Sequence, residues 1–208
     1  MISKSIGAAA STRSRTTATW AAAIATSTFP FRPGERSRKD GSRKTKASHE
    51  EKTLASILLS CHPTARKTIE LSQLNAWLDH LVGWAEIDML CGGVFRTDEL
   101  LANWREWKRF ILALSRDRNI NKRRAALVFL TAPVRYSEDG RVADLGFRVI
   151  RVLQREREII ITKAISWLLR SMVRHHRRLV ATYLKKNRSA LPAVAVRETR
   201  RKIATGRK

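Results

Sequence analysis

A tryptophan and an aspartate, Trp84 and Asp88, stand four residues apart in a segment with helical character. Residues at this spacing share one face of a helix, so the indole and the carboxylate would lie side by side. A carboxylate held in place can stabilise developing positive charge and can orient a water molecule. The spacing alone also fits a buried Trp84 beside a solvated Asp88, and that alternative stays open.

A second group of chemically useful residues forms one stripe of a predicted helix over 159–173. Its members recur at steps of three and four residues, as a single helical face requires. They are Lys163, Trp167, Arg170 and Arg174, called here the basic stripe. The opposite face is apolar and is predicted to pack in the core; it comprises Ile161, Ile165, Leu168 and Met172. A basic face that includes an aromatic ring is typical of surfaces that meet a nucleic-acid backbone. The alternative is a Trp167 buried in the core with solvated cations around it.

A third feature is the basic segment from Lys122 to Arg124, directly before the apolar residues 125–130. One of its cations, Arg123 or Arg124, could face a phosphate while the helix packs behind it. A solvated basic start to that helix is the alternative.

The common catalytic and cofactor motifs are missing from the sequence. It contains no P-loop, HExxH, GxSxG or GxGxxG pattern. The five histidines do not stand with cysteines or carboxylates at ligand spacing, so we expect no metal site. Cys61 and Cys91 form no CxxC pair, and a reduced intracellular compartment is the default. The sequence contains no run of about 18 apolar residues, which is the length that a membrane-spanning helix needs.

The charge of the chain indicates its class of partner. Among 208 residues, 42 are Lys or Arg and 18 are Asp or Glu, for a net charge of +24. Such a surplus favours a polyanion, because basic side chains displace the counterions held by phosphates. Nucleic acid is therefore the expected partner, and a ribosome-associated or merely basic protein is the alternative.

The first fifty residues differ in composition from the rest. They hold ten basic and three acidic side chains in a background of Ala, Ser and Thr, for a net charge of +7 that leaves +17 on the remainder. We predict that 1–50 is disordered, because it cannot bury enough apolar surface. Residues 51–208 are predicted to form the folded domain. The first 35 residues also fit an organelle-targeting segment, although a basic DNA-binding arm or a start site outside the working protein is preferred.

Apolar periodicity predicts helices throughout the folded part. The expected helices cover 98–115, 74–89 with a division at Gly83, 125–130, 142–153, 159–173, 179–186 and 193–203. The chain is therefore predicted to be all-α. No repeat is visible in the sequence, so periodicity does not separate a helical bundle from a HEAT-like solenoid.

Four segments together resemble the AlkD-like DNA alkylation repair enzymes. Residues 75–91 resemble that family's tryptophan and aspartate helix, and 122–130 its arginine helix. Residues 161–170, with the string Lys-Ala-Ile-Ser-Trp-Leu-Leu-Arg, are similar to its most recognisable motif, and 191–198 to its last helix. The four occur in the family's order and cover roughly residues 70–203.

The resemblance implies a HEAT-like solenoid, an ARM-type superhelix with duplex DNA in a concave basic groove. It implies a DNA glycosylase that excises cationic N3- and N7-alkylated purines without metal or cofactor. Asp88 matches the family's catalytic aspartate, Trp84 and Trp167 the two tryptophans that flank the sugar of the damaged nucleotide, and Arg124 the arginine that holds the backbone near the lesion. We expect a cytoplasmic monomer, associated with the nucleoid if the chain is bacterial.

The chain departs from the family on its N-terminal side. The family has additional helices before the tryptophan helix, whereas only 50–60 and 64–72 are available here. Part of the DNA cradle would then be missing, because each unit of such a stack contacts only its neighbours. A non-catalytic HEAT-like protein that binds DNA or RNA is therefore the main alternative function, and a protein-interaction solenoid is a weaker one.

Overall fold

The structure, a computed structural model, describes residues 47–206, and all the regular secondary structure in this range is helical. In chain order the helices are α2 (His49–Cys61), α3 (Pro63–Lys67), α4 (Leu71–Leu78), α5 (Gly83–Gly93), α6 (Thr97–Ala102), α7 (Trp104–Leu114), α8 (Ile120–Val128), α9 (Thr131–Tyr136), α10 (Gly140–Leu153), α11 (Ile159–Lys186) and α12 (Ala193–Thr205). The all-α prediction is confirmed for this part of the chain. The predicted disordered segment 1–50 lies outside the described residues as far as residue 46.

The chain forms two compact units, one that ends at Glu70 and one that begins at Leu71. The described part of the first unit is α2 and α3. Its first helix begins with a capping box: the Ser48 hydroxyl accepts a hydrogen bond from the Glu51 N–H, and the Glu51 carboxylate accepts one from the Ser48 N–H. The buried Arg66 of α3 donates to the carbonyl of Ser60 at the end of α2, which joins the two helices.

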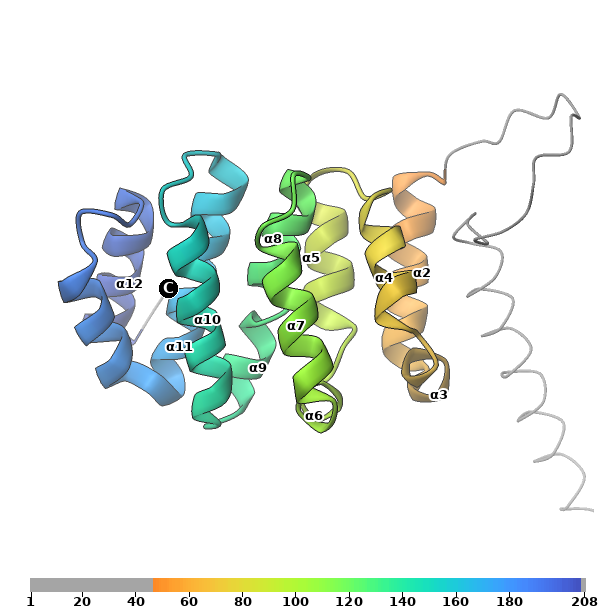
Figure 1. The fold of residues 1–208 in the computed structure, drawn as a ribbon, viewed down its shortest axis with the longest axis horizontal. Helices are drawn as coiled ribbons and strands as arrows, with labels where there is room; N and C mark the ends of the chain where they lie inside the picture. The colour runs from red at the N-terminus through yellow and green to blue at the C-terminus, as the bar shows by residue number, and fades with distance from the viewer. Residues whose placement is uncertain (1–46, 207–208) are drawn as a thin grey trace, which may run out of the picture. The chain divides into compact units, whose positions relative to one another are not determined.

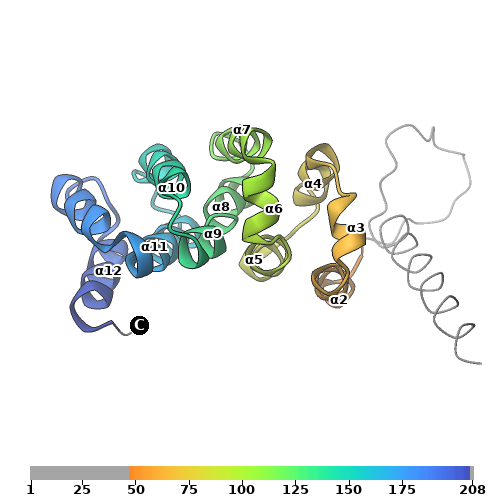
Figure 2. The same ribbon diagram turned by 90° about the horizontal axis from the view of Figure 1, so that it is seen from below.

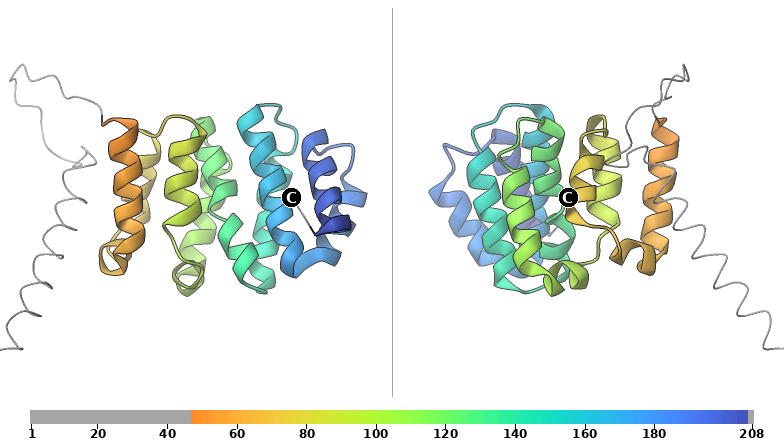
Figure 3. Two further views of the ribbon diagram at one scale, coloured as in Figure 1. Left: turned by 180° about the vertical axis from the view of Figure 1, so that it is seen from behind. Right: turned by 45° about the vertical axis from the view of Figure 1, so that its right-hand side comes forward.

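The second unit consists of two layers of helices, as Figures 1 and 2 show from perpendicular directions. Helices α4, α7 and α10 lie in one layer, while α5, α8, the first half of α11 and α12 lie in the other. Consecutive helices thus alternate between the layers, in the pairs α4–α5, α7–α8 and α10–α11. This alternation is consistent with the predicted helical-repeat fold. Seen from behind, α5, α11 and α12 face the viewer together (Figure 3).

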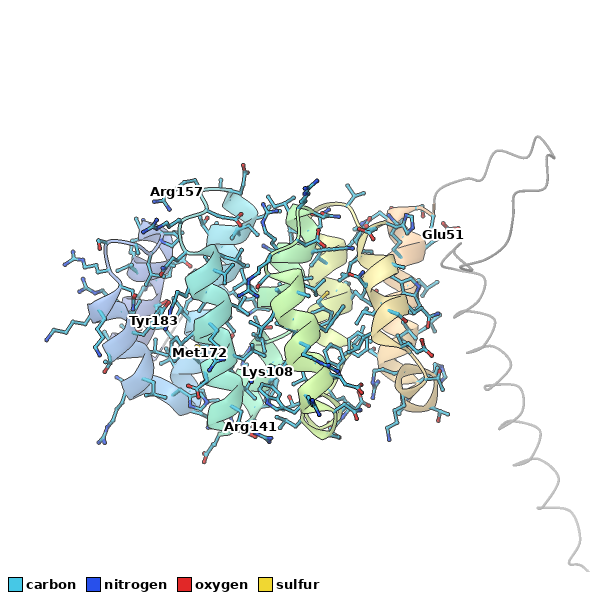
Figure 4. The ribbon with its side chains drawn as sticks, viewed as in Figure 1. Glu51, Lys108, Arg141, Arg157, Met172 and Tyr183 are labelled. Carbon is cyan, nitrogen blue, oxygen red and sulfur yellow. The ribbon has the colours of Figure 1, made fainter. Side chains whose placement is uncertain are left out.

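The core of this unit confirms the predicted apolar face of α11. Ile161, Ile165, Leu168 and Met172 are all fully buried. Helix α10 approaches this face closely at Gly146, where a Cβ atom would meet the Met172 side chain. Further along α11, Tyr183 stacks on Phe147 of α10 with ring centroids 4.5 Å apart; Met172 and Tyr183 are labelled in Figure 4.

The helix boundaries differ from the predictions in several places; α8, for example, begins at Ile120 and not at Ala125. The predicted helix over 98–115 is divided at Asn103, whose φ of −110° and ψ of 39° leave the helical region. The helices predicted over 159–173 and 179–186 are joined into α11, with a kink at His176. Gly83 divides α4 from α5 as predicted, because its φ of +74° is one that side chains disfavour. Periodicity reports buried faces and does not detect such local changes in backbone angle.

None of the helices in residues 47–206 is long and apolar enough to cross a membrane.

The kink in α11 gives the protein a predicted acid sensitivity. His176 is 7% exposed, and burial is the main cause that lowers its pKa below the ordinary 6.5, followed by the charge of His175. The unfolded chain therefore takes up a proton at this position before the folded chain does. Stability that is present above pH 6.5 is lost as the pH falls below that value.

Urea denaturation at pH 7.5 and pH 5 tests this account of His176. The free energy of unfolding of the wild type should fall more between the two pH values than that of His176→Gln. His62→Gln, at a half-buried position in the first unit, is the control and should keep the slope of the wild type. If the free energy of unfolding falls equally between the two pH values in the wild type and in His176→Gln, His176 does not contribute to the acid sensitivity.

Candidate active site

A buried ion pair between Arg124 and Asp88 lies at the centre of the candidate site. The guanidinium of Arg124 donates twice to the carboxylate: Nε lies 2.9 Å from Oδ1, and Nη2 lies 2.7 Å from Oδ2. The third donor group, Nη1, bonds the carbonyl oxygen of Ile160. The side chain of Arg124 is only 6% exposed and that of Asp88 19%. One arginine on α8 thereby connects α5 with the start of α11.

Two polar contacts hold α8 and α5 in the positions that this pair requires. The Asn119 side chain caps α8 by accepting the N–H of Asn121, whose own side-chain amide donates to the carbonyl of Leu81 at 2.9 Å. Leu81 directly precedes the start of α5, where the Val82 N–H donates to Glu86 at 2.7 Å. The start of α8 is thus attached to the turn before α5, which sets Arg124 opposite Asp88.

Helix α5 presents Trp84, Asp88 and Gly92 at successive steps of four, so the three residues share one face. Trp84 is 60% exposed, whereas Asp88 is mostly buried and paired. The alternative of a buried Trp84 beside a solvated Asp88 is therefore wrong.

Trp167 of α11 reaches the same face of α5. A Cβ atom on Gly92 would lie 3.4 Å from Trp167 Cη2 and 3.3 Å from Val128 Cγ1. The ring is half-buried, so Trp167 is neither a pure core residue nor fully solvated. The structure thus brings Asp88, Trp167 and Arg124 together from three helices. Gly92 belongs to the site and was missed from the sequence, although its place eight residues after Trp84 could have indicated it.

The other two cations of the basic segment are also bound within the protein. Lys122 is 6% exposed and its Nζ lies 2.8 Å from the Asp79 carboxylate. Arg123 forms a double hydrogen bond with Glu156, at 2.8 and 3.2 Å, and its Nη1 donates to the carbonyl of Arg118 at 2.8 Å. The segment is therefore not a solvated helix start. The phosphate contact expected of Arg123 stays a prediction.

Next to Trp167, on the side of α11 that faces α12, lies an open cavity of about 450 Å³. Its lining holds Trp167, Arg170 and Arg174 of the basic stripe, and also Arg135, Arg177, Lys202, Ser171, Val173 and Gly206. We call it the Trp167 pocket. Its lining includes no carboxylate, so it is a strongly cationic surface. Lys163, the remaining member of the stripe, is exposed on α11 and does not line the pocket.

Three polar interactions orient Arg170 of the basic stripe. The Ser166 hydroxyl donates to Glu198 of α12 at 2.5 Å, and Arg170 lies 3.6 Å from the same carboxylate. Arg170 also donates to the Ser166 carbonyl at 3.2 Å. The Arg174 side chain forms no hydrogen bond or ion pair with other described residues and is exposed. The pocket cations from other helices, Arg135 and Lys202, carried no signal in the sequence, because they come from α9 and α12.

Cys91 lies behind Asp88 and is buried. Burial raises the pKa of its thiol well above the ordinary value, and the negative charge of Asp88 adds to the effect. The thiol is therefore neutral and unreactive at physiological pH, because the thiolate is the nucleophilic form. No cluster of three metal-binding side chains occurs within residues 47–206.

A family model described as DNA alkylation repair enzyme matches residues 44–203, which is most of the chain. No curated protein sequence matches the chain.

Gly92 and Gly93 offer a matched test of the packing of Trp167 on α5. Alanine is generally favoured over glycine inside a helix by about 0.5–1 kcal/mol. A Cβ at Gly93 meets nothing within 4 Å, whereas one at Gly92 presses on Trp167 and Val128. Gly93→Ala should therefore raise the free energy of unfolding, whereas Gly92→Ala should not raise it. Denaturant titration of both variants measures the difference, and an equal gain in both would contradict the close packing of Trp167.

Proposed function

The chain belongs to the DNA alkylation repair enzyme family, and we propose that it is a monofunctional DNA glycosylase that excises cationic N3- and N7-alkylated purines from duplex DNA. Membership confirms the resemblance read from the sequence and assigns the protein to DNA repair. The observation that carries the proposal is the Asp88 carboxylate, which Arg124 holds on the face of α5 that carries Trp84 and Gly92. Gly92 in turn packs close to Trp167, which lines the cationic pocket.

Asp88 suits the chemistry of such a reaction. An N3- or N7-alkylpurine already carries positive charge, so it leaves without being protonated. When the bond between C1′ and the purine nitrogen breaks, its electron pair goes to the base and neutralises that charge. The sugar becomes oxocarbenium-like, and a nearby carboxylate stabilises it. Water then adds to C1′ and loses a proton, which leaves an abasic site and a neutral alkylpurine.

The two tryptophans would bind on either side of the reacting sugar. Aromatic faces attract cations through their ring quadrupole, which favours both the alkylated base and the developing sugar cation. Trp84 is exposed enough to meet a ligand, and Trp167 lies at the edge of its pocket. The role is supported by the position of Trp84 on the α5 face and by that of Trp167, which packs against Gly92 of the same face from α11.

Arg124 acts in this proposal as a positioning residue. All three of its nitrogen positions bond within the protein, and two of them fix the plane of the Asp88 carboxylate. Each carboxylate oxygen retains a further lone pair with which to face a water molecule or a sugar. The contact with the DNA backbone that the resemblance implies for Arg124 stays a prediction.

The DNA backbone would be held by the basic stripe and the Trp167 pocket. Lys163 and Arg174 are exposed and form no hydrogen bond or ion pair with other described residues, while Arg170 is oriented by Glu198. Oriented guanidinium groups bind phosphate with two parallel hydrogen bonds. The donors of Arg123 are occupied, so this residue would add to the positive charge near the DNA more than it would contact a phosphate directly. The protein would work as a monomer, without cofactor, in the cellular compartment that holds the DNA.

One observation favours a non-catalytic DNA-binding protein as the second candidate. The bidentate contact with Arg124 places a positive charge directly on Asp88. A paired carboxylate stabilises a sugar cation less than an unpaired one does, because the two charges partly cancel. Such a protein would bind DNA with strong salt dependence and release no base.

Asp88→Asn tests the proposed glycosylase. The variant keeps the size of the side chain and removes its charge, so release of 7-methylguanine from methylated duplex should fall by about 100-fold or more. Binding to undamaged duplex, measured by fluorescence anisotropy, should be at least as tight as in the wild type.

Glu156→Gln is the matched control for Asp88→Asn. It neutralises a carboxylate that pairs with the neighbouring arginine of α8 in the same bidentate way, but that follows α10 and is not part of α5. Base release by this control should stay within about threefold of the wild type. Undiminished release by Asp88→Asn would refute the role of Asp88, and no release by the wild type would favour the binding protein.

A further inference from the structure

A second basic cavity lies at the turn between α11 and α12. Its volume is about 600 Å³, and it is lined by Arg188, Ser189, Leu191, Ala193, Val196, Arg197 and Arg200. We call it the corner pocket. It belongs to the end of the second unit that is remote from α4 (Figure 2).

The corner pocket and the Trp167 pocket lie on different faces of α12. Successive residues of a helix are 100° apart, so Arg200 and Lys202 point in nearly opposite directions. Lys202 lines the Trp167 pocket, and Glu198, one turn before it, contacts Arg170. Arg200, with Val196 one turn before it, lines the corner pocket instead. A duplex bound against the basic stripe would therefore leave this face of α12 available.

The three arginines of the corner pocket resemble Arg174 of the basic stripe in having no hydrogen-bond or ion-pair partner, and they differ in this from the paired arginines of the candidate site. Arg123, Arg124 and Arg170 each contact a carboxylate. The exposed side chains of Arg188, Arg197 and Arg200 form no hydrogen bond or ion pair with other residues in 47–206, and no carboxylate lines their cavity. Three unpaired cations that converge from a turn and a helix repel one another unless an anion joins them.

The floor of the corner pocket adds two features that suit a phosphodiester ligand. Leu191 and Val196 are buried beneath the arginines and offer an apolar surface to a sugar. The pocket also includes Ala193, the first residue of the 13-residue helix α12, whose N-cap Pro192 makes no side-chain cap. The N–H groups of the first turn have no partner within the helix.

We propose that the corner pocket is a second phosphate-binding site, which takes the backbone of duplex DNA outside the lesion-binding groove. This inference rests on duplex DNA as the partner but not on base excision. Guanidinium groups match phosphate oxygens in geometry and bind them in a bidentate manner. The phosphates come either from a distant part of the duplex in the groove or from a second duplex.

The test replaces the three arginines together, as R188Q/R197Q/R200Q. The matched control R105Q/R109Q/R148Q removes the same charge from exposed arginines of α7 and α10 that form no hydrogen bond or ion pair with other described residues. Affinity for undamaged duplexes of about one and about four helical turns is measured by anisotropy over a range of NaCl concentrations. Bridging is measured as energy transfer between two differently labelled short duplexes.

Binding of a distant part of the same duplex predicts a change on the long duplex only. There, the corner variant should lower the magnitude of the slope of log affinity against log NaCl concentration by about 2–3. A second duplex is indicated when bridging is lost while affinity for a single short duplex is unchanged. R188K/R197K/R200K keeps the charge and should recover part of either effect. The proposal is overturned if the corner variant and the control behave alike in both measurements.

Base release distinguishes this proposal from the proposed function. On the short duplex the corner variant should release 7-methylguanine at the rate of the wild type, because its residues lie outside the active site. If the corner variant loses long-duplex affinity or bridging but still releases 7-methylguanine, the corner pocket is supported as a phosphate-binding site. A wild type that releases no base would refute the glycosylase and leave the corner pocket to be judged by binding alone.

Discussion

The bidentate ion pair between Arg124 and Asp88 is the interaction on which the candidate site depends. It crosses from α8 to α5, and the same guanidinium reaches the carbonyl of Ile160 at the start of α11. Removing one partner of such a buried pair typically costs about 3–5 kcal/mol, because the other charge is left unpaired. A single side chain thus sets both the orientation of the carboxylate and the spacing of the three helices that carry the site.

The neighbours of Arg124 extend this arrangement along α8. Lys122 binds Asp79 before α5, and Arg123 binds Glu156 after α10. Three consecutive cations therefore hold three different parts of the second unit, and the cations left for DNA are those on α11 and around the Trp167 pocket. The cations of α8 are thus occupied by carboxylate partners, whereas Lys163 and Arg174 on α11 are exposed and form no hydrogen bond or ion pair with other described residues. The arginines of the corner pocket resemble Lys163 and Arg174 in this respect.

Residue spacing predicted what a single helix determines. The shared face of Trp84 and Asp88, the buried face of α11 and the break at Gly83 all follow from local periodicity or backbone angles. Spacing did not predict that Arg124 would meet Asp88, because the two residues are far apart in sequence and meet only when α8 packs on α5. Gly92 was missed for the same reason, since its importance comes from the ring of Trp167 on another helix. The role of Asp88 was accessible only through resemblance to a family, because a carboxylate on a helix has many uses.

The central claim is that Arg124 works by holding Asp88. The most direct measurement compares Arg124→Lys with the wild type in duplex affinity and in single-turnover release of 7-methylguanine at saturating protein. Lysine keeps the charge but cannot make the bidentate contact. The account predicts affinity within about twofold and a release rate lower by about 100-fold, as expected for a misplaced reacting group. Weakened, salt-dependent binding with an unchanged release rate would contradict it and assign Arg124 to the DNA backbone.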